Sequence, residues 1–339
     1  MLCASGAAAH DVSLDVTGST ISQSQNNPRT GSFGAAGSGS IDFNDSWSAW
    51  AGLTFTRDLG TKTAEQSSPG SNIFLINAGG LFIPNDHLMF MVAGNFAPPS
   101  RQAHSTTNTF ELPTRTETVS VTVNSLTTSG GMSLMGSWMS NGFGELNHTV
   151  DLLVGVTAFN SDQKIEVPDT FAGAVWRAHC SQPKYSGSNY CPLVNGVTST
   201  LVQARLGATY TLTIGRRFDL GLDGAFYVYS EDPTALGYFS VVEFGRLPEL
   251  GSGVPVAPYL FSGKVFSQYR FEKFAFKLSY QYGHSVGGYG ANHFVSLRTS
   301  YKVRPGLKLT LTLSGQADAS ANGLLNFGVQ GTLGGLYSF

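Results

Sequence analysis

Basic side chains gather in one stretch of the chain, at positions that alternate with apolar residues. In an extended backbone such positions face the same side, because successive side chains of a strand point in opposite directions. Lysine and arginine lining a narrow passage orient polar solutes and bias permeation toward anions or zwitterions. The set consists of Lys264, Arg270, Lys277, Arg298, Lys302 and Lys308.

Acidic side chains occupy the same kind of position elsewhere. One group lies near the amino-terminal end and comprises Asp11, Asp15 and Asp42. A mixed group, on three consecutive expected strands, comprises Asp151, Arg205 and Asp223, which are placed to form a ladder of charges. The alternative is that such charges only hydrate the wall and pair with one another. We favour this alternative for the ladder, and selectivity for the basic set.

Catalytic and metal-binding patterns are missing from the sequence. His148, His284 and His293 are candidates for an outward-facing hydrolase site, but no nucleophile spacing accompanies them. The aspartates form no paired-acid, calcium-loop or phosphate-loop motif. We therefore expect no enzyme activity, no metal and no cofactor.

The cysteines favour a structural role. Cys180 and Cys191 are eleven residues apart in a segment rich in Pro, Ser, Gly and Tyr. This arrangement predicts a disulfide formed in an oxidising compartment. A zinc site would need a second pair of ligands, which the sequence does not offer.

Composition separates this chain from most water-soluble proteins. Only 12% of its 339 residues are charged, whereas 41 are glycine and 12% are aromatic. The net charge of -2 provides no electrostatic footprint for nucleic acid. No run of 18 apolar residues is present, so we expect no transmembrane helix.

Apolar and polar residues alternate along most of the chain. The segment "LKLTLTLSGQ", residues 307–316, places leucine at every second position, and "ANHFVSLRTSYKV" and "AFKLSYQYGH" follow the same rule. Helical spacing is nowhere sustained. The pattern predicts strands with one apolar face and one polar face.

Short turn signals alternate with longer connections. The short turns are 44–46, 84–87, 141–145, 216–218, 272–274 and 304–306, and the longer connections are 24–31, 60–71, 97–116, 161–198, 230–254, 284–291 and 317–322. These thirteen connections give about fourteen strands and put both termini on the short-turn side. We expect one closed antiparallel β-barrel, with the first strand, near 11–23, paired to the last.

The composition of the polar strand face indicates which solvent, water or lipid, contacts the apolar strand face. A soluble sandwich carries many Lys and Glu on its outer faces, whereas the polar face here is mainly Gly, Ser, Thr, Asn and Gln. Rings also recur on the apolar face near strand ends, at Trp47, Tyr259, Tyr269, Tyr301, Tyr337 and Phe339. We therefore expect lipid outside the barrel and water inside.

The last strand, "LLNFGVQGTLGGLYSF", resembles the carboxy-terminal assembly signal of the outer-membrane β-barrel family of Gram-negative bacteria. Gly334, Tyr337 and Phe339 fit the signal, while Leu333 departs from the polar residue usual before the glycine. The resemblance implies an outer-membrane location, contact with lipid and lipopolysaccharide, and insertion by the barrel assembly machinery. It does not identify a solute.

The domain organisation is expected to be simple. Residues 1–10 resemble a truncated leader, and residues 11–339 form a single barrel domain. The long loop 161–198 either folds into the pore or covers the outside, and both alternatives stay open. Small inward residues make a continuous water path plausible.

One region carries apolar residues on both faces, with Leu75, Leu81, Met89 and Met91 inward. Such a patch suits a packed loop, which we expect, or a path for an apolar substrate, as in the fourteen-stranded fatty-acid transporters. The leading function is a passive pore for small hydrophilic solutes. The alternatives are a loop-plugged structural or export barrel working with periplasmic or envelope-complex partners, and a transporter of hydrophobic substrates.

Overall fold

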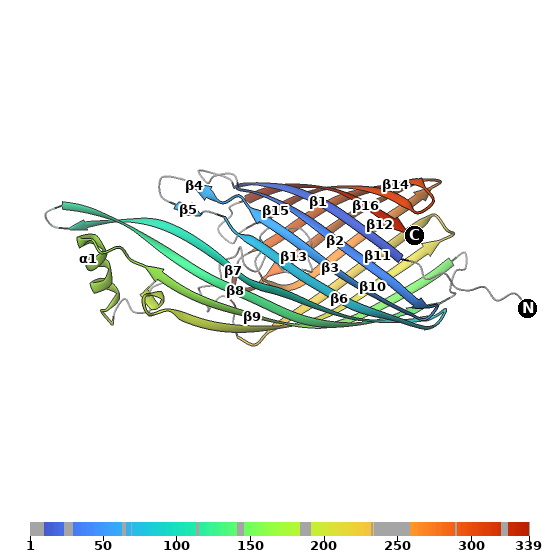
Figure 1. Cartoon of the computed structure of the whole chain (residues 1–339), viewed down its shortest axis with the longest axis horizontal. Helices are drawn as coiled ribbons and strands as arrows, with labels where there is room; N and C mark the ends of the chain where they lie inside the picture. The colour runs from blue at the N-terminus through green and yellow to red at the C-terminus, as the bar shows by residue number, and fades with distance from the viewer. Residues whose placement is uncertain are drawn as a thin grey trace, which may run out of the picture.

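The computed structural model describes residues 10–23, 30–62, 66–68, 70–112, 115–140, 146–183, 191–231, 233, 258–288, 290–319 and 325–338. Fourteen long antiparallel strands form one closed sheet and follow one another around the ring in chain order (Figure 1). The first seven are β1 (His10–Gln23), β2 (Thr30–Asn44), β3 (Trp47–Asp58), β6 (Asn72–Asn85), β7 (Leu88–Leu112), β8 (Arg115–Met139) and β9 (Leu146–Glu166). The other seven are β10 (Val197–Ile214), β11 (Phe218–Tyr229), β12 (Tyr259–Phe271), β13 (Phe274–Ser285), β14 (Ala291–Arg304), β15 (Leu307–Ala319) and β16 (Leu325–Ser338).

Closure of the ring depends on the pairing of β1 with β16. The pairing runs from Asp11 opposite Ser338 to Gln23 opposite Asn326 without a register shift. The predicted partnership of the first and last strands is therefore confirmed. A closed ring leaves no edge strand, so every barrel strand has a neighbour on both sides.

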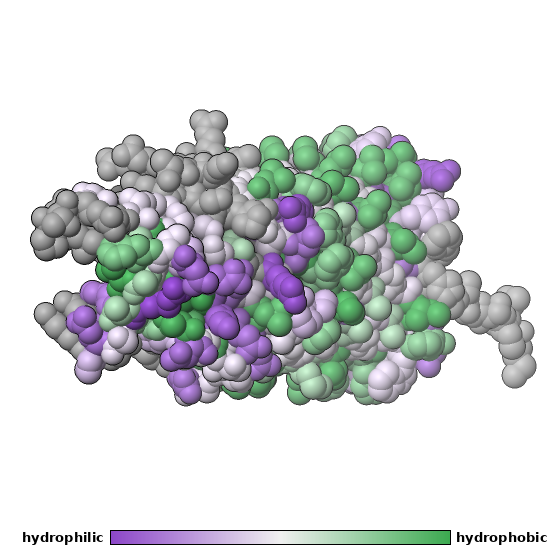
Figure 2. Space-filling model, turned by 60° about the vertical axis from the view of Figure 1, so that its left-hand side comes forward, coloured by the Kyte–Doolittle hydropathy of each residue, from purple (hydrophilic) through white to green (hydrophobic). Residues whose placement is uncertain are grey.

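The alternation in sequence becomes an apolar exterior. On β15, Leu309, Leu311 and Leu313 point outward and are about half exposed, whereas Thr310 and Ser314 on the inner face are buried. The same inversion holds around the ring, where outward Leu152, Leu222 and Leu333 are 58 to 62% exposed. Figure 2 shows hydrophobic residues spread over the part of the barrel nearer the termini. Because apolar side chains face outward and hydrogen-bonding groups are paired, this surface suits hydrocarbon.

Short turns close the end of the barrel at which β1 begins and β16 ends (Figure 1). Two of them use the same device: the Asn44 side chain accepts hydrogen bonds from the backbone N–H groups of Ser46 and Trp47, and Asn85 does so for His87 and Leu88. The predicted turns at 44–46, 84–87, 216–218, 272–274 and 304–306 lie between strands, and 141–145 lies outside the described residues. Bacterial outer-membrane barrels carry their short turns at the periplasmic end, so we call this end of the barrel the periplasmic end.

The expectation of a loop over 97–116 is wrong. These residues continue β7 and β8, which are 25 residues long and pair with each other as far as Leu112 opposite Arg115. The register shifts once, between Ala97 and Ser100, where two prolines lack backbone N–H donors. Hydroxyl pairs then bridge the two strands, and the small hairpin of β4 (Thr61–Lys62) and β5 (Gln66–Ser68) pairs with β7. The hairpin formed by the ends of β7 and β8 thus gains hydrogen-bonding partners from β5, which an isolated hairpin would lack.

The predicted loop 161–198 is partly strand and partly helix. Its first six residues complete β9, and it then forms the helix α1 (Phe171–Cys180) and the short helix η1 (Cys191–Asn195). Thr170 caps α1, since its side chain accepts a hydrogen bond from Gly173 N. The disulfide between Cys180 and Cys191 joins the two helices, as the sequence predicted.

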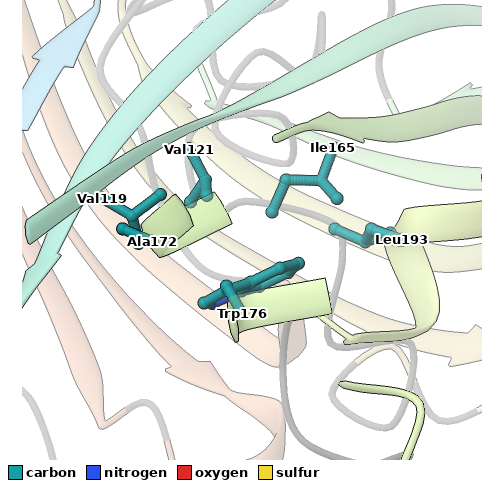
Figure 3. Close-up of a cluster of buried hydrophobic side chains, with 6 residues drawn as sticks. All are labelled: Val119, Val121, Ile165, Ala172, Trp176 and Leu193. Atoms are coloured by element: carbon teal, nitrogen blue, oxygen red, sulfur yellow. The ribbon is translucent and has the colours of Figure 1, made fainter. Parts of the chain in front are cut away.

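These two helices lie at the end of the barrel opposite the termini (Figure 1). Figure 3 shows Ala172 and Trp176 of α1 and Leu193 of η1 packed against inner-face side chains of β8 and β9. The strand residues of this buried cluster are Val119, Val121 and Ile165. The helices therefore cover the inner face of the projecting strands and do not enter the membrane-spanning part. No helix among the described residues is both long and apolar enough to cross a membrane.

Candidate functional site: the wall of the lumen

An apolar patch crosses four strands on the inner face of the barrel. Leu81 pairs with Met91, Met91 with Met135, and Met135 with Leu153, so the row is continuous from β6 to β9. All four side chains are partly exposed, and each lies within seven residues of the periplasmic end of its strand. We call these four residues the apolar inner patch. Leu81 and Met91 were predicted from the sequence to face inward, as were Leu75 and Met89, whereas Met135 and Leu153 were not.

Three of the predicted basic residues form a second wall. Lys264, Lys277 and Arg298 lie on the inner faces of β12, β13 and β14, and Lys277 stands directly opposite Arg298. Within the described ranges, no carboxylate oxygen lies within 4.0 Å of their nitrogens. Like charges directly opposite each other destabilise a sheet. We call these three residues the basic wall.

An aromatic ring supports the centre of the basic wall. The ammonium of Lys277 lies 4.1 Å from the centroid of the Phe266 ring. The tip of that ring in turn lies over Gly221 of β11, where an added Cβ would be 2.0 Å from Cζ of Phe266. The glycine makes room for the ring, and the ring attracts the cation through its face.

The other predicted basic residues have different surroundings. Arg270 forms a two-pronged ion pair with the buried Asp219, so its charge is matched. Lys302 and Lys308 stand opposite each other near the periplasmic turn and are exposed. The basic set is therefore divided into a wall inside the barrel, an ion pair, and a pair of cations at the periplasmic mouth.

The acidic residues near the amino-terminal end lie elsewhere around the ring, whereas Asp223 of β11 stands opposite Lys264 of the basic wall. Asp15 of β1 pairs with Gly334 of β16 and its carboxylate lies over that glycine, where a Cβ would be 1.7 Å from Oδ1. This close approach explains locally why a glycine of the predicted assembly signal is needed. Asp42 faces inward near the periplasmic end of β2. Tyr337 lies on the outer face, and Phe339 is outside the described residues.

The predicted ladder of three charges does not form. Asp151 and Asp223 both stand opposite Thr209, whose hydroxyl donates a hydrogen bond to Asp223 at 2.7 Å. Arg205 lies four residues farther along β10, opposite Gly155 and Tyr227, with its guanidinium carbon 5.9 Å from the Tyr227 ring centroid. Residue spacing in sequence could not show this, because register depends on where each turn ends.

A buried cluster of tyrosines lies on the inner face of β11 and β12, farther from the periplasmic end than the basic wall. Tyr227 of β11 packs against Tyr259 of β12, and the hydroxyl of Tyr229 donates to the carbonyl of Tyr259 at 2.8 Å. The expectation that Tyr259 faces lipid is wrong. A register shift between Tyr259 and Phe261 turns Tyr259 inward, where it is 3% exposed.

The three candidate histidines face outward. The Nδ1 atom of His148 is 2.7 Å from the Tyr210 hydroxyl, and that of His293 is 2.8 Å from the Tyr280 hydroxyl. His284 stacks on Phe261 with ring centroids 5.3 Å apart. Each histidine thus has an aromatic partner on the lipid-facing surface.

The apolar inner patch and the basic wall face each other across the lumen. In the ring of fourteen strands, β6 and β13 are seven strands apart, and so are β7 and β14. Lys277 and Arg298 also lie three and six residues from the periplasmic ends of their strands, a depth close to that of Leu81 and Met91. The lumen therefore has an apolar patch on one side and a cationic wall on the opposite side.

Comparisons with known proteins identify the fold. No protein-family profile matches the chain, and no curated protein sequence matches it. Among solved structures, a FadL homologue from Pseudomonas aeruginosa is similar over 97% of this chain and 89% of its own, with a TM-score of 0.58 and 12% identity. The monoaromatic hydrocarbon channel CymD gives a TM-score of 0.55 at 10% identity, covering 98% of this chain and 88% of its own. The toluene transporter TbuX from Ralstonia pickettii gives 0.55 at 10% identity, covering 98% and 89%.

The closed ring, the apolar exterior and these likenesses define the class of protein. The chain is a bacterial outer-membrane β-barrel of fourteen antiparallel strands. At 10 to 12% identity the likeness concerns the fold alone. The residues of the lumen must therefore decide what the barrel does.

Proposed function

We propose that this barrel conducts small hydrophobic molecules across the outer membrane. The observation that carries the proposal is the apolar inner patch, which runs unbroken across four strands of a lumen that is otherwise largely polar. An apolar surface in contact with water costs about 25 cal/mol per Å². A hydrophobic solute that binds to the patch removes the contact of the patch with water. It also removes its own apolar surface from water, so burial of both surfaces favours its entry.

Methionine suits such a path. Met91 and Met135 stand opposite each other at the centre of the patch. The unbranched thioether adapts to solutes of different shape and contacts aromatic rings favourably. The monoaromatic and toluene transporters among the similar structures have the same strand architecture, which is compatible with this proposal.

Entry of an uncharged fluorescent probe tests the proposal. Cells that make the barrel are mixed with 1-N-phenylnaphthylamine, whose fluorescence rises when it passes the outer membrane and meets lipid. We expect faster entry than in cells without the barrel, and we expect the M91D/M135D variant to remove most of the gain. Charge in the patch replaces apolar contact with a strongly hydrated group.

Matched variants make the result specific. The M91L/M135L variant keeps the surface apolar and should retain entry, and Ser133→Asp adds a charge on the same inner face of β8 but outside the patch. Surface levels and heat-modifiable migration report assembly of each variant. Unchanged entry in an assembled M91D/M135D barrel would refute the proposal.

A second candidate rests on the basic wall. Lys277 and Arg298 stand opposite each other without a carboxylate partner among the described residues, and Arg298 is exposed. Such a wall favours anions in an aqueous pore. We propose selective passage of small hydrophilic anions as the alternative, and ionic current in planar bilayers distinguishes the two functions.

A further inference from the structure

The periplasmic rim of the barrel carries opposite charges on opposite arcs. On one arc, Arg216 and Arg217 occupy the turn between β10 and β11, Lys273 the turn between β12 and β13, and Arg304 the end of β14. All four are exposed. We call these four residues the basic rim. On the other arc, Asp45 and Asp86 occupy the turns after β2 and β6.

Backbone hydrogen bonds hold the turns of the basic rim side by side. Arg270 N, at the end of β12, donates to Arg217 O at 2.7 Å. Lys302 N, near the end of β14, donates to Lys273 O at 2.8 Å. The three turns therefore form one continuous edge, and the cations on it stay close together.

Outward aromatic rings place this edge at the boundary of the membrane. Phe271 and Phe274 flank the turn at Lys273 on the outer face and are 47% and 43% exposed. The guanidinium carbon of Arg304 lies 6.0 Å from the centroid of the outward Tyr337 ring. Aromatic rings settle at the level of lipid headgroups, so the basic rim lies at the same level.

No described carboxylate matches the cations of the basic rim. Within the ranges that the structure describes, no carboxylate oxygen lies within 4.0 Å of a side-chain nitrogen of Arg216, Arg217, Lys273 or Arg304. Glu272 is the acidic residue on the turns of this arc, and it is exposed. The edge therefore keeps a net positive charge next to the headgroups.

We propose that the basic rim binds the headgroups of anionic phospholipids in the periplasmic leaflet. Arginine presents a planar fork that matches phosphate oxygens, and lysine adds a compact charge. The apolar belt just above accepts the acyl chains, so the whole lipid fits the surface. The acidic arc repels the same lipids, which gives the barrel one preferred lipid-binding side. This inference is independent of the solute that crosses the lumen.

Native mass spectrometry of the full chain in detergent tests the proposal with phosphatidylglycerol and phosphatidylcholine as probes. We expect phosphatidylglycerol to bind at least tenfold more tightly, since each basic residue near an anionic surface contributes roughly fivefold, equivalent to about 1 kcal/mol. The R216Q/R217Q/K273Q/R304Q variant should bind the two lipids within about twofold of each other. The control D45N/D86N removes repulsion, so it should not lower the preference for phosphatidylglycerol.

Salt gives a second measurement on the unaltered protein. Raising the ionic strength screens exposed charges, so the preference for phosphatidylglycerol should shrink severalfold. A preference that withstands salt and the four substitutions would overturn the proposal, and so would equal binding of the two lipids by the wild type. Loss of a periplasmic protein from pull-downs with the four-residue variant, with lipid preference unchanged, would assign the rim to a protein partner instead.

Discussion

Gly221 is a position at which the lumen wall has no room for one added carbon atom. Its Cβ would lie 2.0 to 2.6 Å from three carbons of the Phe266 ring, far inside ordinary contact distance. In Gly221→Ala the ring must therefore leave its place over β11, which disturbs its contact with the Lys277 ammonium, 4.1 Å from the ring centroid. Overpacking of this kind costs about 1–3 kcal/mol.

Denaturant unfolding of the detergent-solubilised barrel, followed by tryptophan fluorescence, measures this cost. The midpoint should fall for Gly221→Ala, with an unchanged slope. The matched control is Gly224→Ala, three residues along β11, where the nearest atom to the added Cβ is a backbone oxygen at 4.0 Å. This control should leave the midpoint within experimental error.

The Phe266→Ala background isolates the cause. The three atoms nearest to the added Cβ all belong to the Phe266 ring, so once the ring is gone the second substitution should cost much less. The coupling free energy between the two sites should then be close to the whole cost of Gly221→Ala. If Gly221→Ala lowers the midpoint equally in both backgrounds, the ring is not the reason for the glycine and the explanation fails.

Other parts of the molecule lead to further predictions. Leu311→Lys, on the lipid face, should destabilise the barrel by about 2–4 kcal/mol, whereas Thr312→Lys, one residue on and facing the lumen, should cost far less; equal costs in the same unfolding assay would contradict the assignment of the two faces. Trp176→Ala should remove about 3–5 kcal/mol of local packing from the helices outside the barrel. Limited proteolysis should then cut α1 sooner while the barrel stays heat-modifiable, and an unchanged rate of cutting would mean that the buried cluster does not hold the helix. K277Q/R298Q should lower the anion-to-cation permeability ratio severalfold, as read from the reversal potential under a KCl gradient, and an unaltered ratio would exclude the basic wall as the source of selectivity.

Local features of the sequence were sufficient to predict the barrel. Period-two alternation determines which side chains share a face, whatever the neighbouring strand is, and turn residues such as Asn44 and Asn85 act within a few positions of themselves. The strand count, the pairing of β1 with β16 and the outer-membrane location are therefore confirmed. The inward direction of Leu81 and Met91 follows from the same rule.

Register and ring closure were decided only by the tertiary structure. A single bulge turned Tyr259 from the lipid face to the lumen, and pairing placed Thr209, not Arg205, between Asp151 and Asp223. Residues 97–116 were predicted as a loop, and the strand β5, which pairs with Ser105 and Thr106, comes from another part of the chain.

The opposition of the apolar inner patch and the basic wall has the same origin. Nothing in the local sequence relates Met91 to Arg298, which lie more than two hundred residues apart. They face each other because the sheet closes after fourteen strands, which puts β7 and β14 on opposite sides. Alternation is a property of one strand, whereas the shape and chemistry of a lumen belong to the whole ring.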